Sequence, residues 1–136
     1  MVSKKPVYIA ASLMAILGLV AFSTTGHFSA FAQGSDVNVS IKKGAGTTLT
    51  GSQAYSMDPI QVKVGQKVIW KNDDSTSHTV TSGTGPSDPN MGKEFDSTIS
   101  KLIMPGGTFE HTFTKAGTFP YFCQLHPTMQ GKVIVS

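Results

Sequence analysis

The sequence predicts an all-β protein, an antiparallel β-sandwich, and three observations support this. Apolar and polar residues alternate in short runs, as they do in strands that bury one face. Turn residues, mainly Gly, Pro, Asn and Asp, separate these runs at short intervals. No helical period or internal repeat stands out after residue 33. We therefore expect seven or eight strands in two facing sheets that bury a common core.

The first half of the domain predicts four strands. The run Asp36–Ile41 places three β-branched residues on one face. Pro59 precedes Ile60–Val64, and proline is tolerated at the start of a strand. A Gly-Gln turn then leads into Lys67–Lys71, so we expect these two strands to form a hairpin. After a polar loop, in which two aspartates are expected to be solvated, His78–Thr81 predicts a short strand.

The second half predicts four more strands. A loop rich in Gly, Pro, Ser and Asp covers residues 82–92 and leads to an edge strand around Phe95. Thr108–Phe113 and Thr118–Cys123 alternate in hydrophobicity, and a Lys-Ala-Gly turn separates them. Gly131–Val135 predicts the last strand. The aromatic side chains of this half are expected to fill the core.

The N-terminus predicts an export signal over residues 1–32. Lys4 and Lys5 precede the uncharged, mostly apolar run Val7–Phe22, and Ala30-Phe31-Ala32 matches a cleavage site. An uncleaved membrane anchor is the alternative, because no charge occurs between Lys5 and Asp36. In both cases the remaining residues 33–136 lie outside the cytoplasm, in the periplasm, outside the cell or facing outward from a membrane.

Composition limits what residues 33–136 can do. They suffice for one compact domain, expected to be monomeric. The whole chain carries a net charge of +3, but all basic residues are lysines and two of them lie in the predicted signal. Nine lysines then face eight acidic residues, and this near balance argues against nucleic-acid binding. The single cysteine, Cys123, cannot form an intramolecular disulfide, so it is reactive, intermolecular or metal-bound.

Cys123, His126 and Met129 form the motif that carries chemistry. Neither a helix nor a strand brings residues at i, i+3 and i+6 to one point, whereas a tight loop between two strands does. Thiolate and thioether sulfur combined with imidazole favour copper, and two histidines, one cysteine and a weak axial methionine define an electron-transfer copper site. A second histidine must come from elsewhere. We select His78, at a loop-strand junction, over His111, which lies mid-strand and is expected to be structural.

Two segments resemble the cupredoxins, the blue copper proteins, and are most similar to the plastocyanin and amicyanin group. They read VKVGQKVIWKNDDSTSHTV and GTFEHTFTKAGTFPYFCQLHPTMQGKVIV, and the resemblance covers roughly Val62 to Val135. It implies an eight-stranded Greek-key β-sandwich with copper near one end. It also implies that His78, Cys123, His126 and Met129 bind the copper ion. His126 would pass electrons to redox-partner proteins through a surrounding apolar patch.

Two positions depart from that group. Thr79 stands where the group usually has Asn, whose side chain ties the two ligand loops together. Leu125 stands where it usually has Pro, so Leu125 keeps a backbone N–H. We expect this N–H to point at the Cys123 sulfur, beside the N–H of Thr79.

These residues predict an electron carrier that cycles Cu(I) and Cu(II), and not an enzyme. Copper enzymes on this fold need further histidines, which the three outside the predicted signal do not supply. A C-x-x-C redox motif is absent from the sequence. Two other classes remain as alternatives, namely copper storage or delivery outside the cytoplasm and a metal-free binding sandwich.

Overall fold

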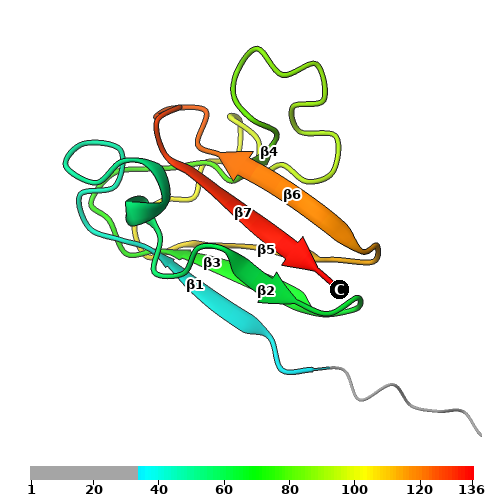
Figure 1. The fold of residues 1–136 in the computed structure, drawn as a ribbon. Helices are drawn as coiled ribbons and strands as arrows, with labels where there is room; N and C mark the ends of the chain where they lie inside the picture. The colour runs from blue at the N-terminus through cyan, green and yellow to red at the C-terminus, as the bar shows by residue number, and fades with distance from the viewer. Residues whose placement is uncertain (1–33) are drawn as a thin grey trace, which may run out of the picture.

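Two β-sheets packed face to face make up the described part of the chain, residues 34–136 of a computed structural model (Figure 1). One sheet has the order β1 (Val37–Ile41), β3 (Lys67–Asn72) and β5 (Thr108–Thr112). The other has the order β2 (Ile60–Val62), β7 (Gln130–Val135), β6 (Gly117–Phe122) and β4 (Thr81–Ser82). A short 3₁₀ helix, η1 (Gly51–Ala54), precedes β2. The predicted export signal lies outside the described residues, and none of the helices described is long and apolar enough to cross a membrane.

The predicted β-sandwich is confirmed, with seven strands among the described residues where the family pattern has eight. The expected edge strand around Phe95 is reduced to an isolated bridge between Asp96 and Thr81. Two backbone hydrogen bonds flank it, from Ser82 N–H to Phe95 O at 2.9 Å and from Ser97 N–H to Val80 O at 3.0 Å. Antiparallel pairing throughout was the wrong expectation. β1 pairs with β3 in parallel, and β2 pairs with β7 in parallel.

The predicted hairpin between β2 and β3 is also wrong. The two strands lie in different sheets, and the turn at residues 65–66 carries the chain from one sheet to the other. This turn is tied to the end of β5, because Gly65 N–H donates to Phe113 O at 2.7 Å and Phe113 N–H donates to Gln66 O at 3.0 Å. The crossing explains the parallel pairs, since parallel neighbours need a connection that leaves the sheet and returns.

Aromatic side chains from both sheets fill the space between the two layers. Trp70 is fully buried, and its ring lies 5.8 Å from those of Phe95 and Phe109 and 5.5 Å from that of Tyr121. Such stacked and edge-on contacts stabilise a core beyond the area that they bury. The strands that lead into the candidate site therefore start from a rigid base.

Candidate metal centre

The loop between β6 and β7 holds the predicted i, i+3, i+6 motif. Cys123 follows the last residue of β6, and Met129 precedes the first residue of β7. Three backbone hydrogen bonds close the loop, from Cys123 N–H to Met129 O (3.2 Å), from His126 N–H to Cys123 O (3.2 Å) and from Met129 N–H to His126 O (2.8 Å). The three side chains are therefore carried by one tight, internally bonded turn, as the spacing predicted.

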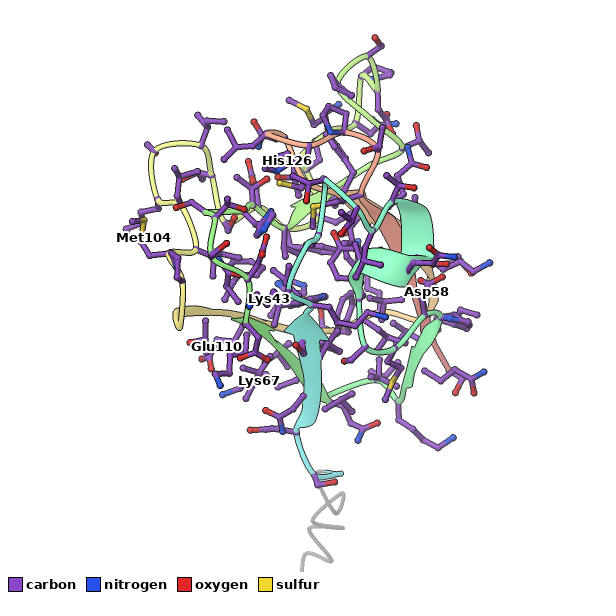
Figure 2. All side chains as sticks on the ribbon, turned by 90° about the vertical axis from the view of Figure 1, so that its left-hand side faces the viewer. Lys43, Asp58, Lys67, Met104, Glu110 and His126 are labelled. Carbon is purple, nitrogen blue, oxygen red and sulfur yellow. The ribbon has the colours of Figure 1, made fainter. Side chains whose placement is uncertain are left out.

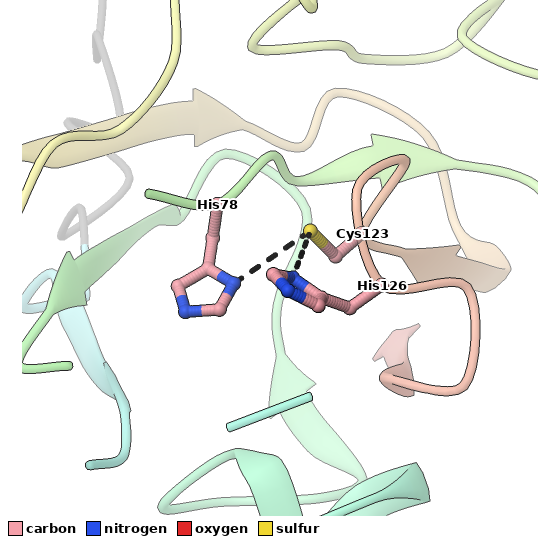
Figure 3. Close-up of side chains that lie close together, drawn as sticks. All are labelled: His78, Cys123 and His126. Carbon is pink, nitrogen blue, oxygen red and sulfur yellow. Dashed lines mark hydrogen bonds between the residues drawn. The ribbon is translucent and has the colours of Figure 1, made fainter. Parts of the chain in front are cut away.

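Three donor atoms meet at this end of the sandwich. Cys123 Sγ lies 3.7 Å from His78 Nδ1 and 3.8 Å from His126 Nδ1 (Figure 3). Within residues 34–136 this is the one group of three or more His, Cys, Asp or Glu whose ligand atoms lie within 4.8 Å of one another. An antiparallel bridge positions His78, whose N–H donates to Ile103 O at 3.2 Å. His111 lies outside the group.

The centre is closed to solvent on most sides. His78, Cys123 and Met129 are all fully buried, and Met129 belongs to the same core cluster as Cys123. His126 is half-buried and lies near the end of the domain remote from the start of β1 (Figure 2). Its ring centroid is 5.1 Å from that of His78. Among these four side chains, His126 alone reaches the surface.

Electrostatics favour a thiolate at Cys123. Burial by itself raises the pKa of this thiol, but hydrogen bonds from His78, the Thr79 N–H and His126 outweigh burial and lower the pKa to about 6. The Thr79 N–H lies 3.3 Å from the sulfur. Burial lowers the pKa of His78, but Cys123 and Asp74 raise it overall. A sulfur that is largely deprotonated at neutral pH is the form that binds metal.

The donor set fits a metal ion. Sulfur–metal and nitrogen–metal bonds of about 2.3 and 2.0 Å, as in zinc sites, place the two donor atoms about 3.5–3.7 Å apart at angles of about 110–120°. The observed separations of 3.7 and 3.8 Å match this span. Two imidazoles and one thiolate, with a thioether in the same loop, suit copper better than a hard cation.

Thr79 connects the two ligand loops, which is the role that the plastocyanin and amicyanin group gives to Asn. Its hydroxyl accepts a hydrogen bond from Gln124 N–H at 2.8 Å. The Gln124 side chain then donates to Thr81 Oγ1 at 2.9 Å, and that hydroxyl donates to Asp96 at 2.8 Å. A threonine that accepts can therefore hold the loops through a short polar network.

The expected contact from Leu125 N–H to the sulfur is wrong. No hydrogen bond joins these two groups in the described structure, and the backbone N–H groups that lower the pKa of Cys123 belong to Thr79 and His126. The reason is the loop conformation, which turns the His126 N–H back toward Cys123, where it also lies 3.2 Å from the carbonyl oxygen. Leu125, next to His126 in the sequence, is 41% exposed.

Sequence reasoning missed Asp74, which it treated as solvated. Asp73 is indeed exposed and pairs with Lys71, but Asp74 is only 6% exposed. Its carboxylate accepts a hydrogen bond from His78 Nε2 at 2.8 Å. Burial raises the pKa of Asp74, but hydrogen bonds from Gly44, His78 and two neighbouring groups lower it overall. The available signal was the four-residue spacing between Asp74 and His78.

His111 lies in β5, half-buried between two aromatic rings, in agreement with a structural role. Its ring lies 5.0 Å from that of Phe95 and 4.8 Å from that of Phe113. Burial lowers its pKa, and Glu94 offsets only part of this effect. The unfolded chain, with a usual histidine pKa of about 6.5, therefore binds a proton more readily than the folded protein.

We expect His111→Phe to make folding less sensitive to acid. In the native protein the contribution of His111 to the free energy of unfolding is fully present above about pH 6.5. It is lost as the pH falls through the lower pKa that His111 has in the folded protein. Phenylalanine cannot take up a proton, so the variant lacks this loss. Urea unfolding at several pH values between about 7.5 and 5, which bracket the usual histidine pKa, measures the difference. If the free energy of unfolding depended on pH in the same way for the two proteins, His111 would not be desolvated in the folded state.

A β-sandwich that gathers one thiolate, two imidazoles and a methionine-bearing loop at one end has the architecture of a cupredoxin. The sequence comparison agrees with this class. The chain belongs to the plastocyanin/azurin family of copper binding proteins, whose family model matches residues 42–136, and its cofactor is copper.

Individual relatives and solved structures support the same assignment. The chain is 30% identical over 117 residues to amicyanin-alpha of Methylorubrum extorquens, covering 86% of this chain and 92% of the relative. It is 30% identical over 128 residues to amicyanin of Paracoccus denitrificans, covering 91% and 93%. The fold is similar to a purple cupredoxin from Nitrosopumilus maritimus, with a TM-score of 0.61, 34% identity, and coverage of 74% of this chain and 100% of that one.

Proposed function

We propose that this protein is a single-electron carrier that binds one copper ion through His78, Cys123, His126 and Met129. The main observation in support is that Cys123 Sγ and two imidazole nitrogens lie close together in a largely buried group. Backbone hydrogen bonds close the loop that carries Cys123 and His126. Amicyanins and plastocyanins among its relatives support this assignment. Copper, when bound, supplies a Cu(I)/Cu(II) couple that accepts and releases one electron.

The protein holds the side chains that would bind copper in fixed positions. Backbone hydrogen bonds fix the loop that carries Cys123 and Met129, and the bridge to Ile103 fixes His78. The Thr79 N–H and both imidazoles surround the sulfur. Because the fold holds these groups in place, we expect little reorganisation to accompany a change of oxidation state. An enzyme activity would need room for a substrate at the centre, so the burial of His78 and Cys123 supports an electron carrier instead.

Electrons would pass to and from the copper ion through the exposed edge of the half-buried His126 ring. Leu125 is exposed next to it, and Pro127 is exposed on its other side in the sequence. An apolar rim of this kind suits brief docking of a redox-partner protein. The protein works in this proposal as a monomer outside the cytoplasm, after cleavage at residue 32 or tethered by residues 1–32.

An absorption spectrum with a redox titration tests the function. Adding Cu(II) to the copper-free protein should produce an intense visible thiolate-to-copper band, which one electron per protein removes reversibly. No such band would support the metal-free binding sandwich. A band that disappears because copper passes readily to a mild chelator, without reversible reduction, would instead support storage or delivery.

Met129→Leu should keep the blue colour and raise the reduction potential. Leucine has nearly the volume of methionine, so the buried site tolerates it, but it removes the thioether that would bind copper weakly and favour Cu(II). Voltammetry measures the potential, and urea unfolding of the copper-free variant checks that the fold is kept. An unchanged potential would show that Met129 is not an axial ligand.

A further inference from the structure

A buried carboxylate lies behind the candidate metal centre, on the side of His78 that faces away from Cys123. Asp74 Oδ2 lies 2.8 Å from His78 Nε2, while the other ring nitrogen, Nδ1, faces the Cys123 sulfur. The Thr76 hydroxyl donates to the same oxygen at 2.9 Å and lies 3.2 Å from His78 Nε2. Asp74 itself is only 6% exposed.

This contact selects one tautomer of His78. An ionised carboxylate can only accept hydrogen bonds, so the proton of the neutral ring must be on Nε2. Nδ1 is then the nitrogen that would bind a metal ion beside the sulfur. Metal-binding histidines commonly have their second nitrogen held in this way, which fixes the ring and raises its basicity.

The second oxygen of Asp74 holds another segment. Oδ1 accepts a hydrogen bond from Gly44 N–H at 2.9 Å. Gly44 begins a tight turn in which Leu49 N–H donates to Gly44 O at 2.9 Å and Gly46 N–H donates to Leu49 O at 2.8 Å. Both glycines have positive φ, which favours glycine at these positions.

This turn packs directly on the second imidazole. A Cβ built on Gly46 would lie 2.5 Å from His126 Cγ, 2.7 Å from its Cβ and 2.9 Å from its Cδ2. Only a residue without a side chain fits there. Just beyond the turn, Gly51 N–H donates to Thr128 O at 2.6 Å, within the ligand loop. The segment therefore contacts His126 and its loop at two places.

We propose that Asp74 is a positioning residue that couples the two imidazoles of the centre. One carboxylate oxygen orients His78, and the other fixes the Gly44–Leu49 turn against the ring of His126. This inference rests on the proposed assignment of both histidines as copper ligands. The proposal explains why an aspartate is buried at this position. One of its oxygens accepts a hydrogen bond from His78, and the other accepts one from the turn that packs on His126.

Asp74→Asn breaks this arrangement with a minimal change of shape. An asparagine side chain has an acceptor oxygen at one position and an NH₂ donor at the other. It therefore cannot accept at both positions, from His78 Nε2–H and from Gly44 N–H. Asp73→Asn is the matched control. It removes the same charge one residue away, from a side chain that is 41% exposed and pairs with Lys71.

Histidine ¹⁵N NMR of the copper-free protein tests the coupling without requiring metal binding. Native His78 should carry a proton on Nε2, also where Nδ1 is protonated toward the thiolate. Asp74→Asn should change the Nε2 signal of His78 and also shift or broaden the ring signals of His126, whereas Asp73→Asn should change neither ring. Asp74→Glu keeps two acceptor oxygens and should restore the native Nε2 signal. A native His78 without a proton on Nε2, or His126 signals unaffected by Asp74→Asn, would overturn the proposal.

The copper-loaded protein gives a second readout. A less basic His78 ligand stabilises Cu(II) less, so Asp74→Asn should weaken Cu(II) binding about tenfold relative to Cu(I). This ratio corresponds to a rise of about 59 mV in the one-electron potential. Asp73→Asn should leave the potential at the native value. An equal shift in both variants would mean that charge alone acts, against a positioning role. If the native protein failed to bind copper, the proposed function would fall, but the NMR comparison would still decide the coupling.

Discussion

Replacing Cys123 with serine is expected to abolish the intense visible band of the copper-loaded protein. The thiol has a pKa of about 6, so a thiolate is available at neutral pH, whereas a serine hydroxyl stays protonated and is a poor copper ligand. The band arises from charge transfer between sulfur and copper, and no other cysteine in the chain can supply it. Absorption spectra of both proteins after addition of one equivalent of Cu(II) measure the effect.

The control for this substitution is the fold of the copper-free variant. Serine is slightly smaller than cysteine, and its oxygen can still accept from the Thr79 N–H that reaches the sulfur at 3.3 Å. Urea unfolding should therefore differ little between the copper-free proteins. An intense band in a folded Cys123→Ser protein would mean that the colour arises elsewhere and that the ligand assignment is wrong.

Gly46→Ala is expected to have the second largest effect. Gly46 lies outside the ligand loop, but a side chain at this position would collide with His126. The added methyl group would lie 2.5 Å from His126 Cγ, well inside van der Waals contact, so the ring or the turn must move. A non-glycine residue at φ +77° also costs about 1–2 kcal/mol in backbone strain. We expect weaker copper binding, a shifted visible band and displaced His126 signals in NMR.

Gly106→Ala separates the two causes. Gly106 has a φ of +80°, almost that of Gly46, but nothing lies within 4 Å of the position that its added methyl group would take. Both variants should lose similar stability from strain, whereas only Gly46→Ala should alter copper binding and the visible spectrum. Matching copper affinities in the two variants would show that the turn does not hold His126.

The ligand loop is the part of this protein that the sequence determined by itself. Cys123, His126 and Met129 are close in the chain, and a turn that joins two strands at that spacing brings them together whatever lies around it. Alternating hydrophobicity likewise determined that the protein is a β-sandwich, because burying one face of each strand needs two facing sheets. His78, which lies 45 residues away from Cys123, was selected for its place at a loop-strand junction, and the resemblance to cupredoxins supported that choice.

Only the tertiary structure decided which strands pair and which polar residues support the site. A turn signal at residues 65–66 specifies a reversal of the chain, but the sheet that the next strand joins depends on distant partners, here β1 and β5 for β3. Asp73 and Asp74 look alike in sequence, yet the fold exposes the first and buries the second against His78 and Gly44. Thr79 meets Gln124, and Gly46 meets His126, across long separations in the chain. Such contacts have no local signal, because hydrogen bonding and close packing depend on positions that only the assembled sheets define.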